Sequence, residues 1–261
     1  MEAQIKKTVK SGNSSAVILP RAWLHKEVRV ELVRKNDGEI LCDVIKTLKV
    51  HLDLNKVIGI YLVGSYARGE ENERSDVDVL VITSDISKEL INEGVYSILI
   101  VSKELIEHKL KNDLLPLGPM IKEAKSLINK EYLDCLEVRI TKKNIQWYID
   151  TTKDKINLIE RVIEEERKNK KKVIGDRLVY TIVLRIRTLM MIKGLKLGSA
   201  YSNHELINII KNVSGETNAY DSYTCVKENG KEGYLTRIEE AEKLNHYLKK
   251  QLVEIRKLIK K

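Results

Sequence analysis

The fold of the central part of this chain is best predicted from residues 57–82, VIGIYLVGSYARGEENERSDVDVLVI. Two apolar segments of strand length, 57–63 and 77–82, flank a polar loop that opens with Gly64 and Ser65. Apolar runs of roughly four to eight residues, bounded by glycine and polar residues, favour buried β-strands. The sequence therefore predicts two strands joined by a polar loop.

Two carboxylates at the start of the second segment, Asp76 and Asp78, are the main chemical feature. Because side chains alternate along a strand, both project from one face and can reach the same divalent cation. Mg²⁺ prefers oxygen ligands, usually one or two carboxylates with phosphate oxygens and water, and it offsets charge at a reacting phosphorus atom. The pair favours phosphoryl or nucleotidyl transfer; the alternative for such a pair alone is two solvated surface acids.

The loop before the aspartates carries groups suited to a phosphate. Gly64 lets backbone amides approach a phosphate closely, and the Ser65 hydroxyl can donate to it. Arg68 or Arg74 can add a forked cationic contact. Gly-Ser followed by ten residues and then Asp-x-Asp, between two apolar strands, is far more specific than Asp-x-Asp alone.

This combination resembles the minimal nucleotidyltransferases of the DNA polymerase beta superfamily, over a span from near His51 to near Arg139. The resemblance implies a small mixed α/β domain that binds a nucleoside triphosphate, with ATP favoured, together with Mg²⁺ or Mn²⁺. It implies that Asp76 and Asp78 are the catalytic metal ligands. It assigns nucleotide contacts to Gly64, Ser65, Arg68 and Ser75. A hydroxyl of a protein, nucleic acid or small-molecule acceptor would attack the α-phosphate and release pyrophosphate.

One residue departs from this family pattern. The family supplies a third carboxylate from a later strand, and the corresponding segment, 94–101, has Ser97 where that acid is expected. Either Glu93 or a residue from another domain replaces it, or the domain binds a nucleotide with weak or no transfer. Loss of a metal-binding base would cost roughly 10²–10⁴ in rate.

The first 48 residues are expected to form a small β domain. Short strands with turns are predicted up to residue 33, then a hairpin turn at 36–38 and a strand over 39–45. The arrangement K-x-G-N-S-x-x-V-x-L-P-x-x-W, from Lys10 to Trp23, resembles AbrB-type swapped-hairpin domains. The resemblance implies a DNA-binding homodimer with phosphate contacts at Lys6, Lys7, Lys10 and Arg21. The alternative is a β appendage with solvated charges.

The last part of the chain is expected to be helical. Apolar residues recur at helical spacing over 150–172 and 176–192, and a helix from Pro119 to residue 129 is predicted before them. Capping boxes at Ser202 and Thr236 predict two later helix starts. Such a domain resembles the HEPN-like or substrate-binding helical partners of the superfamily.

Two arginines and four tyrosines of this helical part are secondary candidates. Arg185 and Arg187 are not followed by the histidine that marks ribonuclease versions of such domains, so RNA cleavage is not predicted. The two arginines either face solvent or a domain interface, or line the nucleotide cleft as phosphate contacts. The tyrosines are either structural or base-stacking and acceptor groups: Tyr201, Tyr220, Tyr223 and Tyr234.

Composition and charge define the broad class. Of the 261 residues, 43% are hydrophobic, and the net charge of +9 divides into +4, −3 and +8 over residues 1–50, 51–145 and 146–261. The apolar runs are shorter than the roughly 20 residues that span a bilayer. Three widely spaced cysteines suggest a reducing cytoplasm. A cytoplasmic protein without a membrane partner is expected.

We therefore expect a multidomain α+β protein. Its predicted parts are a small N-terminal β domain over 1–48, a central mixed α/β nucleotidyltransferase domain over 49–145, and a C-terminal helical bundle over 146–261.

Overall fold

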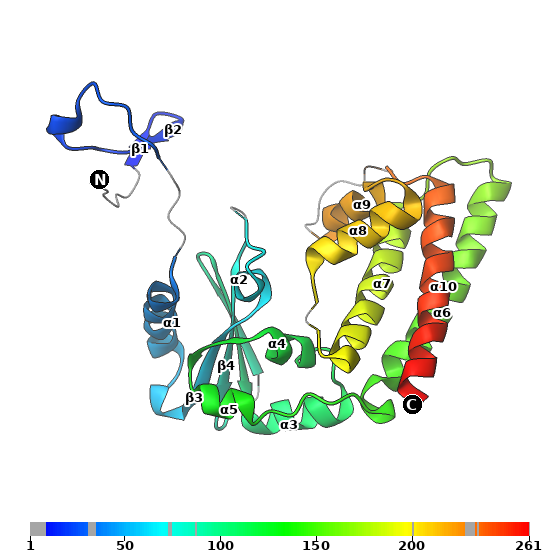
Figure 1. Cartoon of the computed structure of the whole chain (residues 1–261), viewed down its shortest axis with the longest axis horizontal. Coiled ribbons are helices and arrows are strands. Elements are labelled where there is room, and N and C mark those ends of the chain that lie inside the picture. The colour runs from blue at the N-terminus through cyan, green and yellow to red at the C-terminus, as the bar shows by residue number, and fades with distance from the viewer. Residues whose placement is uncertain are drawn as a thin grey trace. The chain divides into compact units, whose positions relative to one another are not determined.

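A computed structural model gives the architecture of the chain (Figure 1). The residues that it describes are 9–30, 35–72, 75–86, 88–199, 201–227, 233 and 235–260. The chain divides into two compact units, Met1–Asp43 and Val44–Lys261. Small sheets and many helices confirm the expected α+β class.

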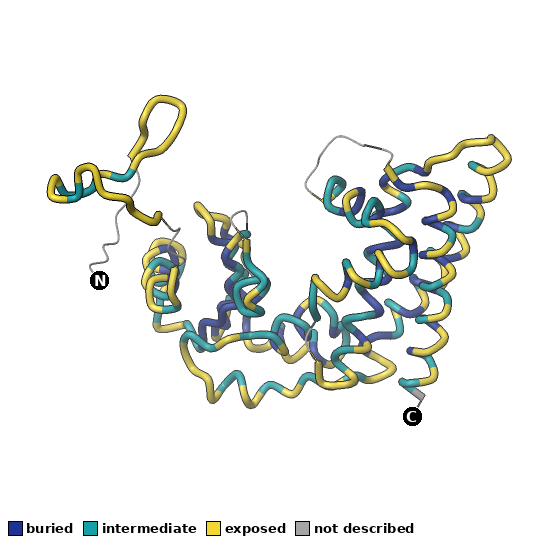
Figure 2. The backbone as a smooth tube through the Cα atoms, turned by 45° about the horizontal axis from the view of Figure 1, so that its top comes forward, coloured by how far each residue is buried: buried dark blue, intermediate teal, exposed yellow. Residues whose placement is uncertain are grey.

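The first unit contains a small β element. Strands β1 (Val9–Ser11) and β2 (Ser14–Ala16) pair antiparallel, and a 3-10 helix follows at Arg21–Trp23. Residues 28–30, predicted as strand, have no regular structure, and the rest of that predicted strand lies outside the described residues. None of residues 9–30 is buried, as the exposed colouring in Figure 2 shows.

The predicted hairpin turn at 36–38 and strand over 39–45 are wrong, because these residues lie in or directly before helix α1 (Asp37–His51). A capping box starts the helix: the Glu39 N–H donates to Asn36 Oδ1 at 3.0 Å, and the Asn36 N–H donates to Glu39 Oε2 at 2.9 Å. Apolar residues at every fourth position are buried: Ile40, Val44 and Leu48. Capping and helical spacing outweigh the Asn-Asp-Gly turn signal.

The second unit starts with a five-stranded mixed sheet in the order β5-β6-β4-β3-β7. Its strands are β3 (Val57–Leu62), β4 (Val77–Thr83), β5 (Lys88–Glu93), β6 (Tyr96–Ser102) and β7 (Lys125–Ile128). Strand β4 pairs antiparallel with β3 and parallel with β6. Both apolar segments of the central motif are thus confirmed as neighbouring inner strands, and their runs of buried residues suit that position.

Short helices lie between or after these strands: α2 (Gly64–Arg68), α3 (Lys103–Asn112), α4 (Gly118–Glu123) and, after β7, α5 (Lys130–Asp134). The helix predicted from Pro119 to residue 129 is correct only at its start. Pro119 lies in the first turn of α4, but residues 125–128 form β7. They pair with β3, whose backbone groups on that side would otherwise lack partners.

The predicted helical bundle follows. It consists of α6 (Lys142–Lys168), α7 (Asp176–Leu197), α8 (Asn203–Ser214), α9 (Asn218–Lys227) and α10 (Ile238–Lys260). The apolar faces of these helices share one core, which Figure 2 shows as dark inner faces. Helix α7 continues past residue 192, where the predicted helical segment ends, and its last residue is Leu197, followed by Gly198 as its C-cap. None of the helices within the described part of the chain has the length and apolar character of a membrane span.

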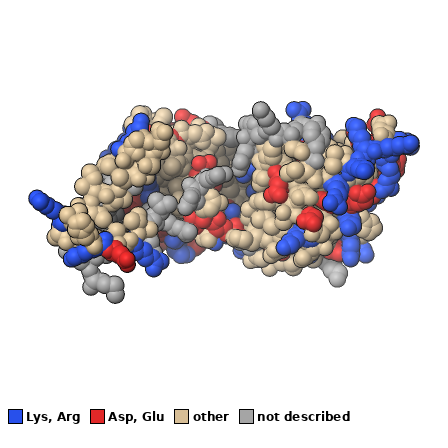
Figure 3. All heavy atoms as spheres, turned by 90° about the horizontal axis from the view of Figure 1, so that it is seen from above, with Lys and Arg blue, Asp and Glu red and all other residues tan. Residues whose placement is uncertain are grey.

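Basic side chains gather over the turn between α6 and α7 (Figure 3). The exposed members are Arg167, Lys168, Lys170, Lys171 and Lys172. Two of them form ion pairs, Lys171 with Glu166 and Arg167 with Glu242, each at 2.6 Å. This run is therefore a solvated helix end in which acids and bases pair.

Candidate active site

The two aspartates lie where β4 begins. The Val77 N–H donates to the Val95 carbonyl at 2.7 Å, and the Val63 N–H donates to the Asp78 carbonyl at 2.9 Å. Val77 is only 1% exposed, whereas Asp78 is half-buried and Asp76 is exposed. The backbone therefore fixes the alternation that puts Val77 in the core and both carboxylates on the opposite face.

The electrostatic surroundings of Asp78 favour a bound cation. Burial raises the pKa of Asp78, and the neighbouring Asp76 and Glu123 carboxylates raise it further, against the effect of Lys227 and Arg68. A divalent cation would relieve the repulsion between the two carboxylates. Asp76 and Asp78 thus fit Mg²⁺ or Mn²⁺, with phosphate oxygens and water as the other ligands. The described residues include no group of three or more His, Cys, Asp or Glu side chains around a metal position, so this fit rests on the two aspartates.

Gly64 lies directly against this pair. It opens α2 immediately after β3 with φ +69°, a left-handed conformation that glycine adopts at little cost. A Cβ atom added there would overlap Asp78 Oδ2. Only glycine therefore lets this turn approach the carboxylate so closely.

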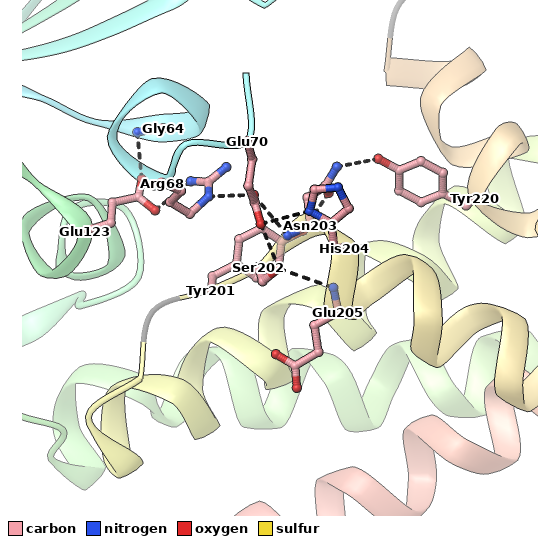
Figure 4. A network of polar contacts seen from close by, with 10 residues as sticks. All are labelled: Gly64, Arg68, Glu70, Glu123, Tyr201, Ser202, Asn203, His204, Glu205 and Tyr220. Atoms are coloured by element: carbon pink, nitrogen blue, oxygen red, sulfur yellow. Dashed lines mark hydrogen bonds and ion pairs between the residues drawn. The ribbon is translucent and has the colours of Figure 1, made fainter. Parts of the chain in front are cut away.

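Arg68, at the end of α2, lies between two carboxylates (Figure 4). Its Nη1 donates to Glu123 Oε2 at 2.6 Å, and its Nε donates to Glu70 Oε2 at 2.9 Å. Glu123, the last residue of α4, also accepts from the Gly64 N–H at 2.8 Å. Two groups predicted to bind phosphate, the Gly64 amide and the Arg68 guanidinium, thus have protein carboxylates as partners in this structure.

Glu70, two residues after the end of α2, connects this part of the chain to the first turn of α8 (Figure 4). Ser202 Oγ donates to Glu70 Oε1 at 2.7 Å, and the Asn203 N–H lies 3.3 Å from Glu70 Oε2. Burial alone would raise the pKa of Glu70, but hydrogen bonds from Ser202, Arg68 and Asn203 lower it to about 2. A negative charge is also favoured beside the free N–H groups of a helix start.

An aromatic and cationic cluster lies beside this connection. The guanidinium carbons of Arg68 and Arg187 are 5.6 Å and 5.0 Å from the centroid of the Tyr201 ring. Arg187 Nη1 donates to the Tyr223 hydroxyl at 2.9 Å. Asn203 Nδ2 donates to the Tyr220 hydroxyl at 2.7 Å. Residues of α7, α8 and α9 thus meet Arg68 and the residues that follow α2.

A family model described as "Nucleotidyltransferase domain" matches residues 44–182. The chain belongs to this nucleotidyltransferase family. No curated protein matches the sequence.

Two solved structures are similar to this nucleotidyltransferase chain. One is a nucleotidyltransferase-like protein from Exiguobacterium sibiricum 255-15, with 12% identity and a TM-score of 0.36 over 84% of this chain and 74% of that chain. The other is spectinomycin adenyltransferase AAD(9) from Enterococcus faecialis with ATP and spectinomycin, with 16% identity and a TM-score of 0.42 over 84% of this chain and 100% of that chain.

The remaining predicted site residues of the nucleotidyltransferase domain have local roles in the structure. The Ser65 carbonyl accepts from the Glu70 N–H at 2.9 Å, and Ser75 Oγ accepts from the Asn72 N–H at 2.9 Å. Their contacts to a nucleotide stay predictions. Arg74 lies outside the described residues.

The structure shows where Ser97 lies, the residue predicted to stand in place of the third family acid. Strand β6 pairs in parallel register with β4, and Ser97 is the partner of Asp78. Ser97 therefore lies beside the Asp76–Asp78 pair but brings no charge to it. Glu93, at the end of β5, pairs with Tyr96 and is exposed.

The candidate tyrosines and the basic residues of the N-terminal part lie in different parts of the structure. Of the candidate tyrosines, Tyr201, Tyr220 and Tyr223 meet in the cluster, and Tyr234 lies outside the described residues. Lys10 and Arg21 are exposed in the first unit. Lys6 and Lys7 lie outside the described residues.

Sequence reasoning missed Glu70 and Glu123. Glu70 is part of the quoted loop, but nothing in the local pattern distinguishes it from its exposed neighbours. Glu123 ends a helix 55 residues after Arg68, and only the folded chain brings the two together. The capping box predicted at Ser202 indicated a residue of this network besides Gly64 and Arg68, because the Ser202 Oγ that caps α8 also donates to Glu70.

Proposed function

We propose that this chain transfers a nucleoside monophosphate from a nucleoside triphosphate, with ATP favoured, to a hydroxyl of an acceptor. The observation that carries the proposal is the aspartate pair of β4 packed against the Gly64 turn inside a nucleotidyltransferase domain. In the reaction, the acceptor O–H bond breaks, an oxygen–phosphorus bond forms at the α-phosphate, and the bond to pyrophosphate breaks.

Each site residue has a separate role in this proposal. Asp76 and Asp78 hold Mg²⁺ or Mn²⁺, which supplies charge neutralisation at the phosphates when bound. Gly64 gives the triphosphate close access to the backbone, while the Ser65 and Ser75 hydroxyls donate to its oxygens. Arg68 becomes a phosphate contact when the nucleotide replaces Glu123 on it. The helical bundle shapes the side from which a protein, nucleic-acid or small-molecule hydroxyl enters.

Ser97 favours a second candidate, a regulatory or antitoxin-like protein that binds a nucleotide with weak or no transfer. No carboxylate of β6 is available beside Asp78 to take the acceptor proton. In this case the AbrB-like N-terminal part, as a homodimer, would bind DNA through exposed basic residues such as Lys10 and Arg21.

Titration calorimetry with MgATP tests nucleotide binding, and pyrophosphate release measured in parallel tests transfer. We expect Asp76→Asn and Asp78→Asn to weaken MgATP binding at least about 10-fold, the size seen when metal-site residues are lost. Asp85→Asn is the matched control, because Asp85 lies past the other end of β4 in an exposed ion pair with Lys56. Equal affinity in all three variants would contradict the proposed function. Binding without pyrophosphate release would favour the second candidate.

Binding of the full chain to duplex DNA, at about 50 and about 200 mM salt, tests the N-terminal prediction. Affinity should fall steeply with salt, and the double variant Lys10→Gln with Arg21→Gln should reduce the slope by about two. Salt-independent binding, or no binding, would leave the first unit without this role.

A further inference from the structure

Arg187 is an enclosed cation with no carboxylate partner among the described residues. Its side chain is half-buried, Nη1 donates to the Tyr223 hydroxyl, and Nε is buried without a hydrogen-bond partner. Arg68, on the same Tyr201 ring, has two carboxylates within 2.9 Å. The two arginines therefore differ in charge compensation, although they share one aromatic neighbour.

The groups around Arg187 offer dipoles and ring faces instead of a full negative charge. The Tyr201 ring lies 5.0 Å from its guanidinium carbon, and burial raises the pKa of Tyr201, so this phenol is neutral at neutral pH. Tyr180 stacks on Tyr223, with the two ring centroids 5.2 Å apart. Cation–ring contacts are favourable, but each is worth only about 0.5–2 kcal/mol.

Burial of the Arg187 guanidinium carries a desolvation cost, and no carboxylate of the described residues offsets it. A ligand that brings a negative charge would remove this cost on binding. The location fits such a ligand, because Tyr201 also contacts Arg68 (Figure 4). Arg68 ends the short helix α2, which starts at Gly64 against Asp78.

We propose that Arg187 binds a phosphate group of the substrate. The planar guanidinium presents paired N–H donors that match phosphate oxygens, and its Nε donor is unused. The phosphate comes from the bound nucleoside triphosphate or from a phosphate-bearing acceptor, so this role rests on the proposed function. Arg187 would then extend the phosphate site from the sheet domain onto α7.

The test compares Arg187→Gln and Arg187→Lys with Arg177→Gln, an exposed arginine at the start of the same helix. Calorimetry measures the affinity of each full-length protein for MgATP, for inorganic pyrophosphate and for adenosine. We expect Arg187→Gln to weaken MgATP binding about 10- to 100-fold, the effect of one lost charge-assisted contact, and Arg187→Lys to weaken it less. Adenosine binding should not change.

Thermal unfolding without ligand separates this role from a packing role. Because the cation has no counter-ion, Arg187→Gln should unfold at a temperature no lower than Arg177→Gln does. A lower unfolding temperature together with unchanged affinities for MgATP and pyrophosphate would assign Arg187 to packing and overturn the proposal.

Comparison of MgATP with pyrophosphate distinguishes the two sources of the phosphate. It also distinguishes failure of the proposed function from failure of the role of Arg187. An Arg187-dependent loss for MgATP supports the nucleotide as the source, and a loss for pyrophosphate alone supports the acceptor. If Asp76→Asn and Asp78→Asn weaken MgATP binding but Arg187→Gln changes neither ligand, the proposed function stands and the role of Arg187 is overturned. If wild-type protein binds no MgATP, the proposed function fails, and Arg187-dependent pyrophosphate binding decides this inference alone.

Discussion

Gly64 and Gly69 have nearly the same backbone conformation, with φ +69° and +68°, but different surroundings. An alanine Cβ at Gly69 meets nothing within 4 Å, whereas at Gly64 it overlaps Asp78 Oδ2. Gly69→Ala should lower the free energy of unfolding by about 1 kcal/mol through backbone strain alone. Gly64→Ala should lower it by about 1–3 kcal/mol more and also weaken MgATP binding. Urea unfolding and calorimetry check this, and equal effects of both variants would contradict the close approach.

Asp78 combines a functional charge with a cost in stability. Burial, followed by the Asp76 carboxylate, raises the pKa of Asp78, so the folded state disfavours its ionised form. A carboxyl group whose pKa is raised in the folded state favours folding in its protonated form. This contribution to stability is fully present below the pKa of the unfolded chain, and it is lost as pH rises through the pKa of the folded state. Without metal, Asp78→Asn should therefore unfold at a higher temperature than wild type at about pH 7, and the difference should disappear at about pH 3. Its transfer rate should fall roughly 100-fold or more.

Thermal unfolding at both pH values, without Mg²⁺, measures this difference. A variant that is less stable than wild type at neutral pH would show that the Asp78 carboxylate stabilises the free protein. The electrostatic account of the aspartate pair would then be wrong.

The connection between the residues that follow α2 and helix α8 depends on Glu70. The pKa of Glu70 is lowered to about 2, so the ionised carboxylate stabilises the folded state at pH values above 4.5, the ordinary pKa of this group. This contribution is lost as pH falls toward 2. Glu70→Gln should lower the free energy of unfolding by about 1–3 kcal/mol at neutral pH and by little near about pH 2.

Hydrogen exchange at the Asn203 amide reports on the same connection, because this amide donates to Glu70. Exchange should be faster in Glu70→Gln than in Glu89→Gln, which changes an exposed residue of the edge strand β5. The same Asn203 protection in both variants would show that Glu70 does not hold α8.

Elements with a strong local signal were predictable, and those that depend on partners were not. The strands around the aspartates carry uninterrupted apolar runs, and the helices of the bundle carry helical spacing and caps. Helix α1 was missed because a turn signal at Asn36 was preferred to the capping box that includes the same residue. Strand β7 was missed because its strand state depends on pairing with β3, which no local pattern reveals.

At the scale of the whole molecule, the candidate site is assembled from segments that are distant in sequence. The positions of Asp76 and Asp78 follow from alternation along one strand, so the sequence was sufficient to predict them. The carboxylates on Arg68 and the ring shared with Arg187 come from α4, the α2 loop and the start of α8. Their meeting depends on how the bundle packs against the sheet domain, which single-sequence reasoning does not reach.

The position of the label in ATP tests the central claim most directly. Wild-type protein, incubated with Mg²⁺ and an extract of protein, RNA and small molecules as acceptors, receives ATP labelled at either the α- or the γ-phosphate. We predict that α-label enters an acceptor in wild type and Asp85→Asn but not in Asp76→Asn or Asp78→Asn, and that γ-label appears only in pyrophosphate. Transfer of γ-label to an acceptor, or α-label transfer that persists in both aspartate variants, would contradict nucleotidyl transfer at this site.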